Sequence, residues 1–518
     1  MSAKTLMIQG TASSVGKSVM VTALCRVFHQ DGFKVAPFKA QNMALNSFVT
    51  REGGEIGRAQ AVQAEAAGIE PSVDMNPVLL KPEAEAKSQV IVLGKVVKSL
   101  EANHYYDYTP YLLGVIEDSL NRLRSSYDIV MIEGAGSPAE INLKEREIVN
   151  MRVARMANAP VLLAGDIDRG GVFASIIGTL ELLTEEERDL VKGLIINKFR
   201  GDLALLKPGL DFLEKKTGKP ILGVIPYFRG IKIAQEDSVY LEERQVGSAS
   251  RGVDIAIIRL PHISNYDDFD PLEEMSCALR YITEPSELGN PDLIILPGTK
   301  STVADLVYLQ EQGIAQAIIQ RAKAGTPVIG ICGGYQMLGK TINDPYKVES
   351  REISVAGLSL LDIETTFGQV KTTTQIGARV VANKGLFEGL KGVEITGYEI
   401  HMGQTRGQNR APAFQVVETP QGKAYYFDGA ASDDCLIFGS YIHGLFHNVN
   451  FTNALLNRLR QLRGLPAAAT VPINKDKQYN ELARVVRQNL NMRQVYKIAL
   501  GREYVRKNQQ GSNSSIHG

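Results

Sequence analysis

The stretch Pro327-Val-Ile-Gly-Ile-Cys332-Gly-Gly-Tyr-Gln-Met-Leu338 puts a cysteine between two patterns of secondary structure. The apolar run Val328 to Ile331 predicts a buried strand, and the residues from Gln336 onward predict the start of a helix. The backbone must turn sharply between them, and three glycines supply the freedom to do so: Gly330, Gly333 and Gly334. A strand, a tight turn and a helix with Cys332 at the turn are typical of a nucleophile elbow. In the alternative interpretation, Cys332 is a buried small apolar residue.

Backbone amides near this turn can stabilise the negative charge that develops when the cysteine attacks a carbonyl. In an elbow, the amides of Gly333 and Gly334 face the developing oxyanion. A second loop, Pro297-Gly298-Thr299, follows a predicted strand and can offer the amide of Gly298. One such donor is typically worth about 2.7–4 kcal/mol in the transition state. We therefore predict an oxyanion hole formed by Gly333 and Gly298.

A cysteine nucleophile needs a base, because a free thiol is only a few per cent ionised at neutral pH. The chain has seven histidines, and two of them lie at the ends of predicted strands in the second half. His401 lies in Gly397-Tyr-Glu-Ile-His401-Met-Gly403, and His443 lies in Phe438-Gly-Ser-Tyr441-Ile-His443-Gly-Leu-Phe446-His447. Residue type and position leave both candidates open, and either can instead be a core or surface histidine.

The first half opens with a second motif, Gly10-Thr11-Ala-Ser-Ser-Val-Gly16-Lys17-Ser18. It follows a predicted strand at 6–8 and precedes a predicted helix at 19–30, which is the setting of a phosphate-binding loop. In such a loop the backbone amides hold phosphates, Lys17 reaches the terminal phosphates and Ser18 can ligate Mg²⁺. We predict a nucleotide site from Gly10, Thr11, Gly16, Lys17 and Ser18. Five residues rather than four separate the two glycines, so a glycine-rich turn without a ligand is the alternative.

Apolar strands alternate with helical segments through the rest of the first half. Strands are predicted at 33–37, 128–133, 160–165, 193–197 and 221–225, with helices such as 111–124 and 171–183 between them. This alternation predicts a mostly parallel sheet with ligands at the carboxyl ends of its strands. Glu133 ends one strand beside glycines, so we predict that it binds Mg²⁺ together with Ser18. Asp166 and Asp168 follow another strand and belong either to this site or to a solvated turn.

The chain divides into two α/β domains, each a mostly parallel sheet flanked by helices. Polar sequence at 227–254, which includes Gly247-Ser-Ala-Ser-Arg-Gly252, predicts a linker. We predict a phosphate-binding domain at 1–246, an amidase-type domain at 252–450, a helical extension at 451–506 and a disordered tail at 507–518. Within the extension, residues 479–490 have the apolar spacing of a packing helix.

Composition argues against several classes of function. The 518 residues include 57 basic and 57 acidic side chains, so net charge predicts neither nucleic acid nor an anionic membrane as a partner. No apolar run approaches the ~18 residues of a membrane span, and the N-terminus lacks the pattern of a signal peptide. The four cysteines are far apart and show no metal-ligand spacing, which is typical of a reducing compartment. We therefore expect a cytoplasmic location.

The motifs of the first half resemble those of known families. The spacing between Gly10 and Gly16 resembles the phosphate loop of the dethiobiotin synthetase family, which activates a carboxylate with ATP. Four segments resemble, more narrowly, the cobyric acid synthase family: 38–47, 133–143, 165–173 and 196–202. The resemblance runs from residue 5 to about residue 490. It implies that Asn197 reads the nucleotide base and that residues 39–47 line the phosphate and carboxylate site.

The second half resembles class I glutamine amidotransferases, which carry a cysteine on an elbow and a histidine late in the domain. This order favours His443 over His401 as the partner of Cys332. Most of that class has a glutamate two residues after the histidine, but here that residue is Leu445. The cobyric acid synthase branch shares this departure, so the third member of the triad is unassigned. The role of Glu399 is likewise unassigned.

As the resemblance implies, the chain is a ligase that makes adenosylcobyric acid in cobalamin biosynthesis. It would amidate the b, d, e and g carboxylates of adenosylcobyrinic acid a,c-diamide, a corrinoid. ATP with Mg²⁺ would activate each carboxylate, and ammonia from Cys-dependent hydrolysis of glutamine would attack it.

Two alternatives differ in function class. The first is the sister amidase that acts on the a and c carboxylates of the same ring, against which segments 39–47 and 166–173 argue. The second is a switch ATPase of the partitioning type with a degenerate amidase domain. Such proteins carry a second lysine early in the phosphate loop, where this chain has Ala12, Ser13 and Ser14. The sequence carries no signal for the oligomeric state, for the order of amidations, for the residues that contact the corrin ring or for an ammonia channel.

Overall fold

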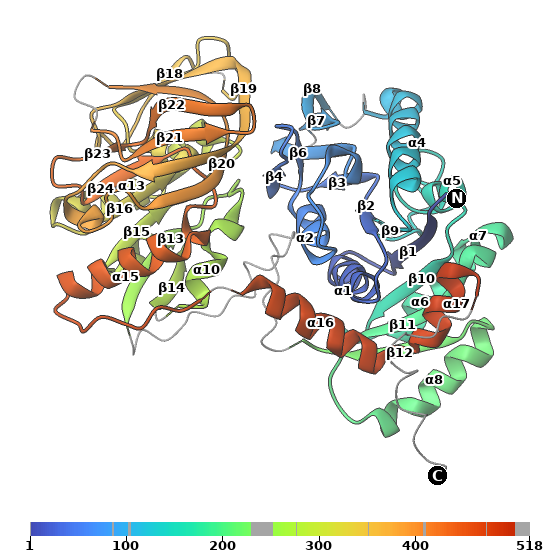
Figure 1. The fold of residues 1–518 in the computed structure, drawn as a ribbon. Coiled ribbons are helices and arrows are strands. Elements are labelled where there is room, and N and C mark those ends of the chain that lie inside the picture. The colour runs from blue at the N-terminus through green and yellow to red at the C-terminus, as the bar shows by residue number, and fades with distance from the viewer. Residues whose placement is uncertain are drawn as a thin grey trace.

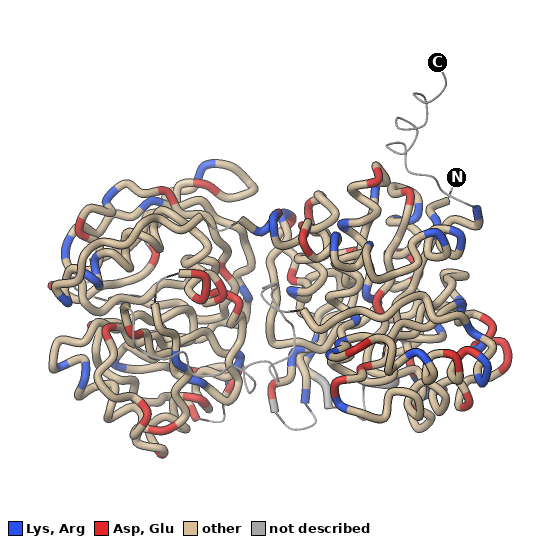
Figure 2. Tube along the Cα trace, turned by 90° about the horizontal axis from the view of Figure 1, so that it is seen from below, with Lys and Arg blue, Asp and Glu red and all other residues tan. Residues whose placement is uncertain are grey.

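The structure is a computed structural model that describes residues 2–84, 87–101, 105–228, 252–275, 277–350, 352–407, 411–472 and 474–502. Two α/β domains lie side by side (Figure 1), the first built from the N-terminal half and the second from the residues after 252. The predicted tail at 507–518 and most of the predicted linker lie outside the described residues. No helix in the described ranges combines the length and the apolar character that crossing a membrane requires. Basic and acidic residues are interspersed along both domains (Figure 2).

A six-stranded parallel sheet forms the centre of the first domain. Its strands are β1 (Lys4–Gly10), β2 (Val35–Phe38), β9 (Ile129–Glu133), β10 (Val161–Asp166), β11 (Val191–Phe199) and β12 (Ile221–Pro226). They lie in the order β12-β11-β10-β1-β9-β2, and each neighbouring pair is parallel. These are the six strands that the sequence predicts, with ends that shift by at most about two residues.

Helices cover both faces of this sheet, because successive side chains of a strand point to opposite sides. Met7 joins the core on one side, while Leu6 and Ile8 join the core on the other. The first core includes α4 (Thr109–Ser126), α5 (Met151–Ala157), α6 (Val172–Leu182) and α8 (Leu203–Thr217), and the second includes α1 (Lys17–Gln30). Two shorter helices are α2 (Arg58–Ala66) and α7 (Glu185–Leu190). Because the strands are buried on both faces, they read as continuous apolar runs in the sequence.

Smaller sheets of the first domain face the second domain (Figure 1). One has the strand order β3-β6-β7-β8, and the other is a two-stranded hairpin of β4 and β5. The bounds are β3 (Gln41–Met43), β4 (Ser47–Val49), β5 (Glu55–Gly57), β6 (Val78–Ala84), β7 (Lys87–Val92) and β8 (Lys95–Glu101). The sequence did not predict these strands, since β3, β4 and β5 have only three residues each and several of the strands carry polar residues that contact the other domain.

The second domain also has a central six-stranded sheet, in the order β14-β13-β15-β16-β24-β23. All pairs are parallel except β23 with β24. The strands are β13 (Val253–Ile258), β14 (Cys277–Ile282), β15 (Leu293–Leu296), β16 (Val328–Ile331), β23 (Ala430–Ala431) and β24 (Ile437–Ser440). The helices are α10 (Asp270–Glu273), α11 (Pro285–Leu288), α12 (Thr302–Glu311), α13 (Ile314–Lys323), α14 (Gly333–Met337) and α15 (Val449–Leu462). The strand that delivers Cys332, β16, therefore lies inside the sheet between β15 and β24.

A further sheet, mainly antiparallel, extends the second domain in the order β18-β17-β19-β21-β22, with β20 paired to β19. Its strands are β17 (Thr341–Asn343), β18 (Ser354–Ala356), β19 (Glu364–Val380), β20 (Glu394–Arg406), β21 (Phe414–Thr419) and β22 (Gly422–Asp428). His401 lies inside β20, which continues for five residues beyond it, so the prediction that His401 ends a strand is wrong. The pairing of β20 with the long strand β19 extends β20 past the glycine at 403.

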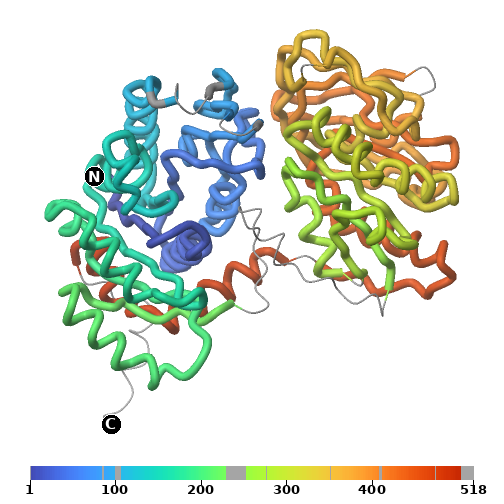
Figure 3. The backbone as a smooth tube through the Cα atoms, turned by 180° about the vertical axis from the view of Figure 1, so that it is seen from behind, coloured from blue at the N-terminus to red at the C-terminus, as the bar shows by residue number. Residues whose placement is uncertain are grey.

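The last two helices return to the first domain (Figure 3). α16 (Lys475–Asn489) and α17 (Met492–Leu500) bury Leu482, Val486 and Val495 in the same core as α1 and β12. Arg487 Nη2 donates to Val27 O at 2.7 Å and lies 2.8 Å from Asp31 Oδ1. By contrast, α15 packs into the core of the second domain, so the predicted boundary at 450 falls inside a helix.

We expect Leu482→Ala to lower the free energy of unfolding by about 2–5 kcal/mol, because a fully buried leucine leaves a cavity. Chemical denaturation followed by circular dichroism measures this. The matched control is Leu462→Ala, since Leu462 is 50% exposed, and its effect should stay within about 0.5 kcal/mol. Equal destabilisation by the two variants would contradict the packing of α16 on the first domain.

Candidate functional site

Cys332 occupies a strained turn between β16 and α14. Its φ is 51° and its ψ is −105°, an unusual conformation for a residue with a side chain that costs on the order of 1–3 kcal/mol. The amide of Cys332 donates to Ser440 O at 2.8 Å, which ties the turn to the end of β24. Two of the glycines are required by close packing: a Cβ on Gly330 would lie 2.7 Å from Gly334 C, and one on Gly334 would lie 2.1 Å from Leu296 O. The surrounding strands thus hold the turn that the sequence predicts.

His443 lies beside Cys332 and shares a hydrogen bond with its sulfur. The histidine follows β24 by three residues and is 1% exposed, while Cys332 is 8% exposed. The ring of Tyr398, from β20, stacks on the ring of His443 at 5.3 Å between centroids. Cys332 Sγ also contacts Ile400 O at 3.6 Å. Of the two histidines that the sequence left open, the structure brings His443 to the sulfur through a hydrogen bond.

Asp268 supplies the carboxylate that the sequence left unassigned. Its Oδ2 lies 2.7 Å from His443 Nδ1, and its Oδ1 accepts from the amide of Gly444 at 2.7 Å. Asp268 belongs to the short helix η3 (Tyr266–Phe269), 175 residues before the histidine. The only indication in the sequence is its position after β13, because the carboxyl ends of the parallel strands of one sheet lie at the same edge. A search for the usual glutamate two residues after the histidine misses it.

The Asp268 carboxylate controls the charge of His443. Burial favours the neutral ring, but Asp268 and Cys332 together outweigh burial and raise the pKa of His443 to about 10. The histidine is therefore an imidazolium at neutral pH. A positive charge beside a cysteine is the environment in which cysteine nucleophiles are found.

The other histidines of the domain have different surroundings. His401 Nδ1 contacts Gly403 O at 2.8 Å, its ring stacks on Tyr441, and burial lowers its pKa to about 4. Burial also lowers the pKa of His447 to about 3, and His447 Nε2 contacts Asp267 O at 3.0 Å. Among the described residues, neither ring forms a hydrogen bond with an aspartate or glutamate side chain, in contrast to His443.

The loop that carries Gly298 lies beside His443 and the elbow. A Cβ on Gly298 would lie 2.9 Å from His443 Cε1, and one on Gly333 would lie 2.7 Å from Thr299 Cγ2. The loop 297–299 therefore packs directly against the elbow, as an oxyanion hole from Gly298 and Gly333 requires. The amide of Gly334 instead donates to Pro297 O at 3.1 Å. The expectation that Gly334 faces the oxyanion is wrong, because its amide is used to hold the loop.

In the first domain, the predicted phosphate loop joins β1 to α1. Gly16 has a φ of 95°, and Lys17 Nζ donates to Ala12 O and to Gly136 O, each at 2.9 Å. Ser18 Oγ donates to Glu133 Oε1 at 2.8 Å, so the loop meets the end of β9. Gly10 ends β1, and the amide of Thr11 continues the sheet by donating to Ala164 O at 3.0 Å. The predicted residues thus converge at the carboxyl end of the sheet.

Glu133 is surrounded by hydrogen-bond donors. It is 1% exposed and also accepts from Lys39 Nζ at 2.9 Å and from Gln63 Nε2. Burial would raise its pKa, but Lys39, Gln63 and Ser18 lower it below the ordinary value. The carboxylate is therefore ionised. Together with Ser18 it offers the hard oxygen atoms that Mg²⁺ prefers, and phosphates and waters commonly supply its other ligands. The described residues contain no group of three or more metal-ligating His, Cys, Asp or Glu side chains.

The remaining predicted residues of the first domain lie around this loop. Asn197 Nδ2 donates to Val15 O at 2.7 Å, while its Oδ1 is buried and has no hydrogen-bond partner among the described residues. Asp166 and Asp168 pair with cations rather than only with solvent: Lys198 Nζ lies 2.9 Å from Asp166 Oδ2, and Arg200 Nε lies 2.9 Å from Asp168 Oδ1. Asp166 and Lys198 lie at the ends of β10 and β11, and Asp168 and Arg200 lie just beyond those ends.

The predicted 39–47 segment divides between two surroundings. Lys39 contacts Glu133, as described above. Asn46 and Ser47 instead contact the second domain, where Asn46 Oδ1 accepts from the amide of Tyr266 at 3.2 Å. Lys39 thus contacts a residue of the predicted phosphate site, whereas Asn46 and Ser47 contact the other domain.

Related proteins match both domains in one continuous alignment. A cobyric acid synthase from Dehalococcoides mccartyi strain CBDB1 is 58% identical over 496 residues, covering 96% of this chain and 99% of that protein. The chain belongs to the cobyric acid synthase family. Cobyric acid synthases from Sorangium cellulosum and Desulforamulus reducens are 54% and 51% identical, covering 95% and 96% of this chain and 98% of each protein.

Domain families agree with this membership in the cobyric acid synthase family. Residues 6–239 match the CobQ/CobB/MinD/ParA nucleotide binding domain, and residues 254–451 match the CobB/CobQ-like glutamine amidotransferase domain. A solved glutamine amidotransferase covers 41% of this chain at 16% identity and a TM-score of 0.29, too distant to carry an argument. The predicted family, fold class and enzyme class are confirmed: a two-domain α/β chain that is a glutamine-hydrolysing ligase of cobalamin biosynthesis.

We expect the charge of His443 to make folding stability depend on pH. The raised pKa means that the protonated ring stabilises the folded chain fully below about pH 6.5, and that this contribution is lost as pH rises toward about 10. The Tm of the wild type should therefore fall more between pH 7 and pH 10 than the Tm of His443→Gln. Differential scanning calorimetry at several pH values measures both curves, and parallel curves would contradict the pairing with Asp268.

Proposed function

We propose that the chain converts adenosylcobyrinic acid a,c-diamide to adenosylcobyric acid by amidating its b, d, e and g carboxylates. Glutamine supplies the nitrogen and ATP supplies the energy. The observation that carries this proposal is that a cysteine–histidine–aspartate set and a phosphate loop facing a buried carboxylate occur in one chain. The high identity to cobyric acid synthases over both domains supports the choice of corrinoid.

In the second domain, the proposed reaction is hydrolysis of the side-chain amide of glutamine. Cys332 Sγ attacks the amide carbon, and the carbon–nitrogen bond breaks as His443 transfers a proton to the departing nitrogen. Ammonia leaves, and a thioester to Cys332 remains. Water, deprotonated by His443, then attacks the thioester carbon, and the carbon–sulfur bond breaks, which releases glutamate and regenerates Cys332 beside the protonated histidine. The amides of Gly298 and Gly333 stabilise the oxyanion in both steps.

Asp268 acts through His443 in this scheme and is a positioning residue. Its hydrogen bond to Nδ1 leaves Nε2 of His443 for Cys332 and fixes the plane of the ring. The carboxylate also stabilises the imidazolium, which explains the high pKa of His443. The aspartate thereby does the work that the glutamate two residues after the histidine does in most class I amidotransferases.

In the first domain, the proposed reaction is activation of a substrate carboxylate. A carboxylate oxygen attacks the γ-phosphoryl group of ATP, the bond to the β-phosphate oxygen breaks, and an acyl phosphate and ADP result. Ammonia then attacks the acyl carbon and displaces phosphate, which leaves the amide. Lys17 exchanges its contacts with Ala12 and Gly136 for phosphate oxygens. The buried Oδ1 of Asn197 is suited to accept a hydrogen bond from the adenine amino group.

Ser18 and Glu133 would hold Mg²⁺, with Glu133 in contact with the ion directly or through water. When bound, the ion neutralises charge on the phosphates of ATP. The ion pair of Lys39 with Glu133 keeps the carboxylate ionised in its buried setting. The proposal includes a cytoplasmic location, which is supported by Cys25, Cys277, Cys332 and Cys435 being thiols rather than disulfides.

The alternative of a switch ATPase with a degenerate amidase domain is disfavoured by the geometry around Cys332. A degenerate site has no need of a strained turn, a paired histidine and a buried aspartate. The sister amidase remains the nearer alternative, and amidation assays on both precursors distinguish them.

We expect Cys332→Ser to abolish amidation with glutamine but to keep amidation with ammonium, because ammonia made in the second domain is then replaced from solution. Product formation from cobyrinic acid a,c-diamide with ATP, followed by mass spectrometry, measures both. The control is Cys435→Ser, which changes a buried cysteine of the same domain and should keep both activities. If the wild type forms no amide from either donor, the corrinoid assignment is wrong.

We expect Asp268→Asn to lower kcat for glutamine hydrolysis by at least about 100-fold, because the ring loses its orientation and the charge that stabilises the imidazolium. Amidation with ammonium should persist. Steady-state release of glutamate measures the loss. Asp254→Asn is the matched control, since Asp254 pairs with Arg280 near the start of β13 rather than beyond its end. Loss of ammonium-dependent amidation in Asp268→Asn would contradict a role confined to the second domain.

A further inference from the structure

The turn that carries Asp268 is held by the first domain as well as by its own domain. Asn265, which precedes η3, accepts from the amide of Ser47 at 2.9 Å, and the amide of Tyr266 donates to Asn46 Oδ1 at 3.2 Å. Ser47 begins β4 in the first domain, and Asn46 directly precedes it. These two hydrogen bonds join adjacent residues of one domain to adjacent residues of the other. They fix the position of the turn relative to the first domain.

An ion pair strengthens this contact at the residue next to Asp268. Arg58 Nε lies 2.9 Å from Asp267 Oδ2, and the two residues are 4% and 2% exposed. The second oxygen of Asp267 is buried and has no hydrogen-bond partner among the described residues. Arg58 begins α2, and its own amide donates to Asn46 O at 3.2 Å. The guanidinium is thus held at the surface where the two domains meet.

Asp267 and Asp268 are adjacent buried carboxylates with different tasks. Both oxygens of Asp268 are used, one by His443 and one by Gly444. Burial and the neighbouring Asp268 raise the pKa of Asp267, while Arg58 opposes them. Without Arg58, the Asp267 carboxylate would have to take up a proton or move toward water, because an unpaired buried charge is costly. Either change disturbs the turn that aims Asp268.

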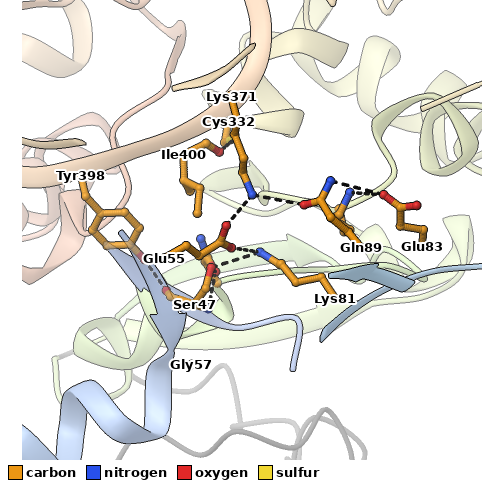
Figure 4. Close-up of polar contacts among 12 residues, drawn as sticks. Ser47, Glu55, Gly57, Lys81, Glu83, Gln89, Cys332, Lys371, Tyr398 and Ile400 are labelled. Carbon is orange, nitrogen blue, oxygen red and sulfur yellow. Dashed lines mark hydrogen bonds and ion pairs between the residues drawn. The ribbon is translucent and has the colours of Figure 1, made fainter. Parts of the chain in front are cut away.

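A second contact from the first domain reaches Tyr398, whose ring stacks on His443. Tyr398 stacks on His443, and its hydroxyl donates to Ser47 O at 3.2 Å (Figure 4). Ser47 Oγ in turn accepts from Lys81 Nζ at 3.1 Å, and Lys81 lies 2.8 Å from Glu55 Oε1. Glu55 completes the contact between the domains by pairing with Lys371 of β19. The first domain therefore contacts both the turn that carries Asp268 and the tyrosine that stacks on His443.

We propose that Arg58 is a positioning residue of the glutaminase site, supplied by the nucleotide domain: its ion pair with Asp267 fixes the turn that keeps the Asp268 carboxylate on His443. The inference rests on the proposed glutaminase role of Cys332 and His443. It adds a group from the other domain, which touches neither glutamine nor the sulfur. The distinguishing expectation is a change in kcat without a comparable change in KM for glutamine, because Arg58 acts on the triad rather than on binding.

The test compares Arg58→Ala, Arg58→Lys and Asp267→Asn in the full chain. With Mg²⁺, ATP and the corrinoid present, Arg58→Ala should lower kcat for glutamate release by about 100-fold and change KM by less than about threefold. Arg58→Lys keeps the charge without the guanidinium geometry, so its kcat should lie between those of the wild type and Arg58→Ala. Asp267→Asn removes the pair from the other side and should show the same loss, and the double variant should be no worse than either single variant.

Two controls separate positioning from general damage. Amidation with ammonium should stay within about twofold of the wild type in each variant, since it does not need the triad. Arg122→Ala removes an ion pair with Asp74 elsewhere in the first domain and should leave glutamate release unchanged. If Arg58→Ala does not fold, Arg58→Lys and Asp267→Asn carry the same comparison.

The outcomes are distinct. An unchanged kcat in folded Arg58 and Asp267 variants overturns the inference, as does parallel loss of ammonium-dependent amidation, which would indicate a structural role only. A rise in KM at constant kcat also overturns it, because it would make Arg58 part of glutamine binding. If the wild type releases glutamate but forms no amide, the proposed function fails, and glutamate release still tests Arg58.

Discussion

The surrounding structure depends on the hydrogen bond between Asp268 and His443, because both groups are buried and charged. A buried imidazolium is stable only beside a carboxylate, and a buried carboxylate needs its remaining oxygen satisfied, which Gly444 does. Both requirements bring the turn after β13 against the turn after β24. Parallel strands make this possible, since their carboxyl ends meet at one edge. The strained turn at Cys332 lies between them, so three loops distant in sequence converge on one sulfur atom.

Features written in local sequence patterns were predicted correctly. The elbow at Cys332 and the phosphate loop at Gly10 to Ser18 consist of glycines next to apolar strands, and the six strands of the first central sheet follow from continuous apolar runs. Asp268 could not be assigned in this way, because nothing in its own neighbourhood distinguishes a carboxylate that orients a histidine from one on a solvated turn. Its role depends on a partner 175 residues away. The length of β20 likewise depends on a distant partner, since β20 pairs with β19. This pairing places His401 inside the strand rather than at its end.

The surface between the two domains is unusual in its buried charge. Glu55 is 1% exposed and pairs with Lys81 of its own domain and Lys371 of the other, and the two lysines hold the pKa of Glu55 well below its usual range despite burial. Such groups add little net stability compared with apolar packing, but they penalise any misaligned docking that leaves a charge unpaired.

Helix α2 joins this surface to the nucleotide site, since Arg58 at its start contacts Asp267 and Gln63 near its end contacts Glu133.

The return of α16 and α17 to the first domain has a consequence for how the chain is made. Their side chains complete a core that also contains α1, β1 and β12, although about 250 residues separate β12 from α16 in sequence. During synthesis, the N-terminal domain therefore leaves the ribosome with one apolar face of its sheet only partly covered, and that face stays so until the last helices emerge. The amidotransferase domain, whose core contains neither helix, can fold earlier. The first domain to be translated is thus the last to complete its core. Until α16 and α17 are made, the uncovered apolar face of its sheet is a defined surface for chaperones to bind.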